Sequence, residues 1–177
     1  MTHEATPIES ETSSVVQGSQ FLGTNGTAIR RDAIVDNRDS TTEKRFRVLS
    51  GNWATSTLVS NAYAGSYANT PARSGSETAR ARFQCTMLAA GRYDVYVWWP
   101  VRPDGATHVA YEIHHAAGGT TARVNQSERG GQWNLLGTFD FEAGSHVVDV
   151  QNGDSKPGAF ECADAVRFVT AGADIGR

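Results

Sequence analysis

Long apolar runs are absent from this sequence of 177 residues. No stretch approaches the roughly 18 consecutive apolar residues that a membrane-spanning helix needs, so we expect no membrane span. The opening residues, MTHEATPIESETSS, lack the basic and apolar regions of a secretory signal peptide, and none is predicted in this chain. An excess of positive charge is also missing, because 16 Lys and Arg stand against 19 Asp and Glu for a net charge of −3. We therefore expect no nucleic-acid partner.

Catalytic motifs are missing as well. The sequence has no G-x-S-x-G nucleophile elbow, no H-E-x-x-H pair and no glycine-rich phosphate loop. Many carboxylates are present, but no spacing singles out a pair as the acid and base of a glycosidase. We predict that the chain is not an enzyme and has no catalytic residues.

Cysteine is scarce. Cys85 and Cys162 lie far apart, and neither belongs to a C-x-x-C or Cys/His pattern of the kind that binds zinc. Two interpretations stay open: one disulfide that links an early strand to the last strand, as in extracellular proteins, or two buried thiols.

What the sequence does contain is a series of short strand patterns separated by turns rich in Gly, Asn and Asp. No segment shows the periodicity of a helix. The expected strand segments are residues 33–40, 43–57, 77–88, 93–99, 107–115, 120–126, 132–141, 145–152 and 163–170. This pattern predicts an all-β fold of two packed antiparallel sheets.

The two ends of the chain differ from this middle part. Residues 1–33 are rich in Ser, Thr, Glu and Gly and form an N-terminal extension, either a flexible leader or a segment that lies on a partner surface. We expect one β-sandwich domain over residues 34–170 and a short tail over residues 171–177.

The segment YDVYVWWP contains two adjacent tryptophans. Side chains alternate between the two faces of a strand. The pattern therefore predicts that Trp99 is buried together with Tyr93, Val95 and Val97. It places Trp98 and Tyr96 on the other face, and Pro100 ends the strand because proline cannot donate to a ladder. That second face is where binding or assembly is expected. A glycan, a loop of the same chain or another subunit are the candidates to cover Trp98.

Several motifs carry a family resemblance: IVDN, GNWATST, GRYDVYVWWP, VNQ, GGQWNLLGTFDFEAG and ADAVRFV. In order and spacing, from Ile34 to Val169, they resemble the golvesin C-terminal-like domain, also described as the xanthan-lyase carbohydrate-binding-like domain. The resemblance implies a jelly-roll-like antiparallel β-sandwich, glycan binding, and an extracellular or cell-surface location. Members are usually attached to secreted polysaccharide-degrading or other enzymes, whereas this chain contains no catalytic domain that we recognise.

Aromatic side chains carry the binding hypothesis, because Trp and Tyr offer flat apolar planes to the C–H faces of sugar rings while a few polar groups add selectivity. A packing role remains the alternative for each ring. For Trp133 this alternative is a position in the core, because Trp133 and Leu135 alternate with Asn134 and Leu136 and apolar groups therefore lie on both faces. The candidate glycan-binding residues are Trp98, Tyr96, Trp53, Tyr67, Trp133, Arg102 and Asn134.

Metal sites are not favoured. Glu112 and His114 share one face of a strand, but the sequence identifies no further ligand for them. His115 falls on the apolar face, where a hydrogen-bonded core histidine is expected. Two loops offer oxygen atoms for a structural calcium ion, although turn capping explains the same residues. These residues are Asp36, Asn37, Asp39, Asn152 and Asp154. No cofactor is predicted.

Two functions follow from these patterns. The first is a non-catalytic carbohydrate-binding module that recognises a polysaccharide or a cell-surface glycan. The alternative is a structural protein that assembles or docks, such as a fibre, surface-layer or virion component. In that case residues 1–33 would make the contacts of a homo-oligomer.

Overall fold

The computed structural model describes residues 20–22, 28–30, 32–153 and 156–172. Most of the predicted N-terminal extension and of the tail lies outside these residues. Two short strands of the extension, β1 (Gln20–Leu22) and β2 (Ala28–Arg30), pair with each other in antiparallel fashion. No helix in the described part of the chain is long and apolar enough to cross a lipid bilayer.

The larger sheet has five antiparallel strands in the order β10-β9-β12-β7-β4. Alternation of apolar and polar residues explains its two faces. In β7, Ala81, Phe83 and Cys85 are buried, and the alternating Arg80 and Arg82 lie on the outer face. The strand bounds are β10 (Gly118–Val124), β9 (Val109–His115), β12 (Gly144–Gln151), β7 (Arg80–Met87) and β4 (Lys44–Ser50).

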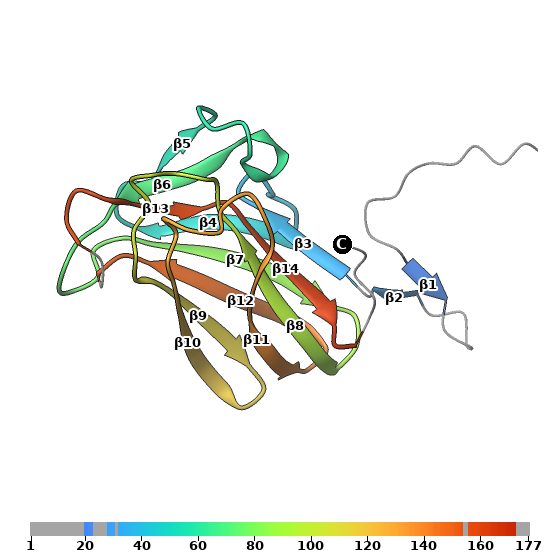
Figure 1. Ribbon diagram of the computed structural model, residues 1–177. Coiled ribbons are helices and arrows are strands. Elements are labelled where there is room, and N and C mark those ends of the chain that lie inside the picture. Colours follow the sequence, from blue (N-terminus) through green and yellow to red (C-terminus); the bar gives the residue numbers. More distant parts are fainter. Residues whose placement is uncertain (1–19, 23–27, 31, 154–155, 173–177) are drawn as a thin grey trace, which may run out of the picture.

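The second sheet has four antiparallel strands in the order β11-β8-β14-β3 and packs against the first (Figure 1). Tyr93, Val95 and Val97 of β8 are buried in the core between the sheets, and Trp99 is buried just beyond the strand. The predicted orientation of YDVYVWWP is therefore confirmed. The strand bounds are β11 (Asn134–Phe141), β8 (Gly91–Trp98), β14 (Ala165–Thr170) and β3 (Asp32–Asp36).

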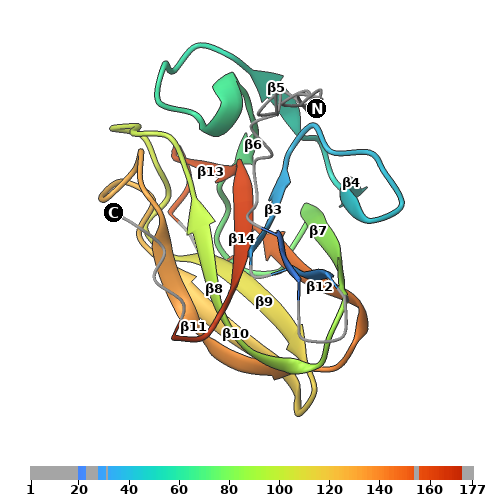
Figure 2. The same cartoon turned by 90° about the vertical axis from the view of Figure 1, so that its right-hand side faces the viewer.

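A third, small sheet lies at one end of the sandwich, beside a single 3-10 turn, η1 (Tyr63–Gly65) (Figures 1 and 2). It consists of β13 (Phe160–Ala163), β6 (Tyr67–Pro71) and β5 (Ala54–Ser56). The all-β sandwich expected from the sequence is confirmed. This third sheet was not predicted, since β6 and β13 carry no clear strand pattern.

The two cysteines are buried thiols that no disulfide joins. Cys85 lies in the core on β7, and Cys162 lies on β13 in the small sheet. Burial raises the pKa of the Cys162 thiol to about 12, so this residue stays protonated and unreactive at neutral pH. Of the two interpretations open from the sequence, the structure supports separate thiols.

Candidate functional site

An open groove of about 450 Å³ lies on the small sheet at the end of the sandwich. Its floor comes from the sheet, and its sides come from the loops that follow β5 and β8. The lining residues are Ala54, Thr55, Ser56, Leu58, Val59, Tyr67, Asn69, Val101, Arg102, Pro103, Asp104 and Phe160. Tyr67 and Arg102 are the two predicted site residues in this lining, although Tyr67 is only 1% exposed and packs in the core.

The register of the small sheet explains the floor of the groove. Phe160 pairs with Pro71 on β6, two positions after Asn69, and Tyr67 lies two positions before Asn69. Residues two apart on a strand, and residues paired across strands, share one face of a sheet. Tyr67, Asn69 and Phe160 therefore share the face that the groove occupies.

Arg102 lies across this floor. Its guanidinium carbon is 4.9 Å from the centre of the Phe160 ring, within the range of a cation–π contact. Nε and Nη2 donate to the two carboxylate oxygens of Asp104 at 2.8 and 2.7 Å, and Nη1 donates to the Tyr67 hydroxyl at 3.2 Å. The hydrogen bond from Arg102 lowers the pKa of Asp104, so this carboxylate is ionised at neutral pH.

Asn61 holds the two sides of the groove together. Its carbonyl oxygen accepts a hydrogen bond from Trp98 Nε1 at 3.0 Å, and its side-chain oxygen accepts one from the backbone N–H of Val101 at 3.0 Å. The GGQW motif packs against this junction. A Cβ atom on Gly130 would lie 2.7 Å from the Val101 nitrogen, and Gly131 has a φ of +71°, so both positions require glycine.

Trp98 is covered by its own chain. Its ring centre is 5.9 Å from that of Tyr63 and 5.4 Å from that of Trp133, and both pairs have edge-to-face geometry. Tyr63 and Trp133 are themselves 5.2 Å apart, and Arg167 lies 5.7 Å from the centre of the Trp133 ring. Trp133 thus packs on the outer face of the four-stranded sheet and not in the core. The cluster of Tyr63, Trp98 and Trp133 fixes the loop that carries Asn61.

Replacing Trp98 by phenylalanine is expected to lower the free energy of unfolding by about 1.5 kcal/mol, since one hydrogen bond and part of an aromatic contact are lost. Urea unfolding measures this change. Tyr96→Phe is the matched control, because the Tyr96 hydroxyl makes no hydrogen bond with another described residue. Equal stability of the two variants would show that Trp98 does not anchor the Asn61 loop.

The remaining predicted site residues lie away from the groove lining. Trp53 packs against the core beside the groove, and Tyr96 is half-buried on the outer face of β8. Asn134 is 4% exposed, and its side-chain nitrogen donates to the carbonyl oxygens of Arg129 and Gln132. The Asn134 amide is therefore used to shape a loop.

Most of the chain matches a known protein family. The Golvesin C-terminal domain family matches residues 33–170. The chain belongs to this family. Xanthan lyase of Bacillus sp. (strain GL1) is 34% identical over 141 residues, which are 78% of this chain and 15% of that protein. This golvesin domain thus spans only a small part of the lyase.

Solved structures agree with this assignment. Paenibacillus xanthan lyase matches with a TM-score of 0.70 and 29% identity, over 82% of this chain and 14% of the lyase chain. A family 35 carbohydrate-binding module from Clostridium thermocellum matches with a TM-score of 0.54 over 78% of this chain and 98% of the module. At 13% identity, the second likeness concerns the fold alone.

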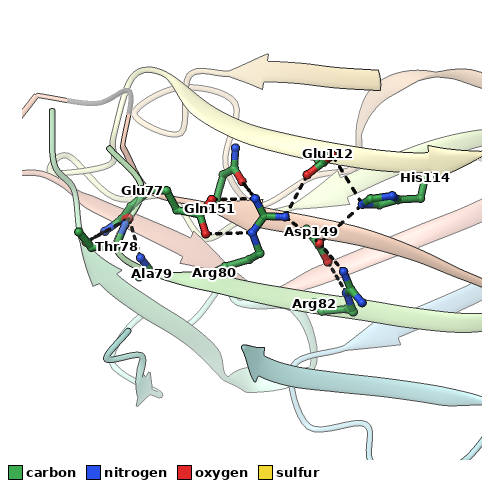
Figure 3. Close-up of polar contacts among 10 residues, drawn as sticks. Glu77, Thr78, Ala79, Arg80, Arg82, Glu112, His114, Asp149 and Gln151 are labelled. Carbon is green, nitrogen blue, oxygen red and sulfur yellow. Dashed lines mark hydrogen bonds and ion pairs between the residues drawn. The ribbon is translucent and has the colours of Figure 1, made fainter. Parts of the chain in front are cut away.

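Outside the groove, the golvesin domain brings one possible set of metal ligands together on the outer face of the five-stranded sheet (Figure 3). Atoms of Glu112, His114 and Asp149 lie within 4.8 Å of one another. However, both carboxylate oxygens of Asp149 already accept hydrogen bonds from Arg82, and one also accepts from Arg80. Two guanidinium groups therefore hold the position that a metal cation would need, and we propose no metal here.

His115, the neighbour of His114, lies on the apolar side of β9. Its ring stacks on Phe139 with centres 4.9 Å apart, and its Nε2 lies 2.9 Å from the Thr120 hydroxyl oxygen. The predicted hydrogen bond of His115 is confirmed, but the residue is only half-buried and does not belong to the core.

The two loops considered as calcium sites are turns in which Asp and Asn side chains cap backbone N–H groups. The Asp36 backbone N–H donates to Asp39, and the Arg38 backbone N–H donates to Asp36. Asn152 accepts hydrogen bonds from the backbone N–H groups of Thr78 and Ala79. Asn152 belongs to a separate turn after β12, and Asp154, the other candidate oxygen donor there, lies outside the described residues.

Near the first of these loops, two buried carboxylate oxygens, one from Asp36 and one from Asp164, could face a cation. The Asn37 backbone N–H donates to the carbonyl oxygen of Asp164, which brings that residue next to Asp36. Asp36 Oδ2 and Asp164 Oδ1 are both buried and accept no hydrogen bond from another described residue. Two such oxygens are fewer than the six to eight that calcium binds. A structural calcium ion, which the sequence does not favour, is therefore not proposed here.

Proposed function

We propose that this golvesin domain is a non-catalytic module that binds a polysaccharide or a cell-surface glycan in the groove on the small sheet. The observation that carries the proposal is the mixed lining of the groove. Exposed apolar side chains lie beside a fixed carboxylate, a guanidinium group and a carboxamide. Sugar rings present the same combination of apolar C–H faces and hydroxyl groups.

The apolar part of the lining is unusually exposed. Leu58 is 91% exposed and Val101 is 53% exposed, and they belong to the two sides of the groove. Exposed large apolar side chains that lie together mark binding surfaces more often than isolated ones do. The C–H face of a sugar ring covers such side chains, while Asp104 and Asn69 can accept hydrogen bonds from its hydroxyl groups.

The relatives support this choice of ligand class. Two of them are xanthan lyases, and a fold neighbour is a family 35 carbohydrate-binding module. Domains of this family are usually attached to secreted enzymes, so we propose an extracellular or cell-surface location for this domain. The assembly alternative depends on residues 1–33, most of which lie outside the described residues, and no contact described above favours it.

Leu58→Ser tests the groove. Because Leu58 is almost fully exposed, the substitution is expected to leave stability unchanged within about 0.5 kcal/mol. It is expected to weaken glycan binding about tenfold, since about 1.4 kcal/mol of apolar contact is lost. Calorimetric titration with xanthan, xylan, mannan and galactan fragments provides the measurement, with wild-type affinities expected in the micromolar to millimolar range.

Leu88→Ser is the matched control, since Leu88 is an exposed leucine just after β7 that does not line the groove. It is expected to bind as the wild type does. Equal weakening by both substitutions, or none by Leu58→Ser, would place glycan binding elsewhere on the domain.

A further inference from the structure

The two charged side chains that line the groove form an ion pair with each other. Among the described residues that line it, Arg102 is the one cation and Asp104 is the one anion. Both carboxylate oxygens of Asp104 accept hydrogen bonds from Arg102, so each charge compensates the other. The formal charge of this lining is therefore zero.

The two charges differ in how accessible they are. The Arg102 side chain is 14% exposed, because its guanidinium group lies against the Phe160 ring and donates to the Tyr67 hydroxyl. The Asp104 side chain is 43% exposed. A ligand that enters from solvent therefore meets the negative group first, and the positive group lies behind it.

This arrangement opposes anionic ligands. A carboxylate on a sugar would come close to Asp104, and like charges brought together at a binding site weaken binding. It could reach Arg102 only by competing with a bidentate carboxylate that is already in place. A neutral sugar meets neither cost, because its hydroxyl groups donate hydrogen bonds to the free lone pairs of Asp104.

We infer that the groove selects neutral glycans and discriminates against glycans that carry uronate groups, with Asp104 as the residue that determines this specificity. The inference rests on the proposed function, glycan binding in the groove. It identifies the ligand class by charge and names one side chain that sets it.

Paired ligands test the inference on the wild-type chain. The probes are galactan and mannan oligosaccharides and the same oligosaccharides with primary hydroxyls oxidised to carboxylates. Calorimetry is expected to show affinities at least about tenfold higher for the neutral forms. Affinity for the neutral forms is expected to stay constant between about 20 and about 500 mM NaCl, because no new charge pair forms.

Substitution of Asp104 tests the assigned residue. Asp104→Asn removes the negative charge and leaves Arg102 uncompensated. The ratio of oxidised to neutral affinity is expected to rise at least about tenfold, and binding of the oxidised forms is expected to weaken at high salt. Asp104→Glu keeps the charge and is the control, with the neutral preference retained. Urea unfolding of both variants checks that they fold.

The outcomes separate the two proposals. Tighter or equal binding of the oxidised forms by the wild type overturns the inference and leaves glycan binding in place. An unchanged affinity ratio in folded Asp104→Asn shows that Asp104 does not set the specificity. Absence of binding to any oligosaccharide of either kind overturns the proposed function itself. Should Asp104→Asn fail to fold, the wild-type comparison and its salt dependence decide the question.

Discussion

Replacing Asp149 by alanine is expected to lower the free energy of unfolding of the golvesin domain by about 3 kcal/mol. Asp149 is fully buried on β12, although it points to the outer face of the five-stranded sheet. Arg82 binds both of its carboxylate oxygens, with Nε at 2.6 Å and Nη2 at 2.7 Å, and Arg80 Nη1 lies 3.1 Å from one of them (Figure 3). Asp149 is thus the anion that holds two cations together.

The size of the effect follows from what remains after the substitution. Loss of one partner of a buried ion pair typically costs about 3 to 5 kcal/mol, because the other charge is left without compensation. Both arginines keep about a quarter of their side-chain surface exposed, so water relieves part of this cost. The lower end of the range is therefore expected, and the midpoint of urea unfolding measures it.

Glu112→Gln is the control for this prediction. Glu112 also contacts Arg80, at 3.0 Å, but its side chain is about a third exposed. Exposed ion pairs contribute less than about 1 kcal/mol, so this variant is expected to resemble the wild type. A loss below about 1 kcal/mol in Asp149→Ala would show that the partners that remain, such as Glu77 and Gln151 for Arg80, suffice to compensate the arginines.

The pH dependence of the same group has a defined sign. Burial raises the pKa of Asp149, but the hydrogen bonds and charges of Arg82 and Arg80 outweigh burial and leave the pKa below its usual value. A lowered pKa in the folded state means that the stabilisation is present above the ordinary pKa of about 4 and is lost as the pH falls through the folded value. The difference between wild type and Asp149→Ala should therefore shrink only under acidic conditions.

Much of the fold could be predicted because its long strands alternate. β7 and β8 place apolar side chains at every second position, and that pattern fixes which face joins the core. The direction of Trp98 and the burial of Trp99 followed from the same alternation. The alternation could not predict that Tyr63 and Trp133 pack on Trp98, because both lie far from Trp98 in the chain.

The groove could be predicted only in part, for the same reason. The sequence singled out Tyr67 and Arg102 by residue type, and Asp104 stands beside Arg102 as a polar neighbour. Phe160 and Leu58 were missed, since β13 is short and an exposed leucine looks ordinary in a sequence. The pairing of β13 with β6 joins distant segments, and backbone hydrogen bonds between Phe160 and the loop of Asp104 and Ala106 bring the Phe160 ring under Arg102.

Asp164 presents the opposite case to Asp149, because this buried carboxylate has no ion pair with a cation among the described residues. It is 1% exposed, and its Oδ2 accepts a hydrogen bond from the Tyr63 backbone N–H at 3.0 Å. Burial raises its pKa to about 8, and the nearby charge of Asp36 adds to this shift, while Arg38 acts in the other direction. The folded domain therefore binds a proton at Asp164 that the unfolded chain releases near pH 4.

Asp164→Asn is therefore expected to raise the free energy of unfolding at pH 7 by up to about 4 kcal/mol. The raised pKa of Asp164 lowers the stability of the wild type by about 1.4 kcal/mol for each pH unit between the pKa of the unfolded chain and pH 7. The Asn oxygen can still accept from Tyr63, and its amide can donate to Asp36. The gain should be absent near pH 4, grow up to about pH 8 and then stay constant, as urea unfolding across this pH range would show.

Asp140→Asn, at the exposed end of β11, makes the same charge change at the surface and is expected to alter stability by less than about 0.5 kcal/mol. The opposite result at Asp164 would be equally informative. If Asp164→Asn destabilises the domain at pH 7, and if calcium raises and a chelator lowers the stability of the wild type alone, then Asp36 and Asp164 share a cation in place of a proton. The charge that burial opposes must be neutralised in one of these two ways, and the sign of this single variant distinguishes them.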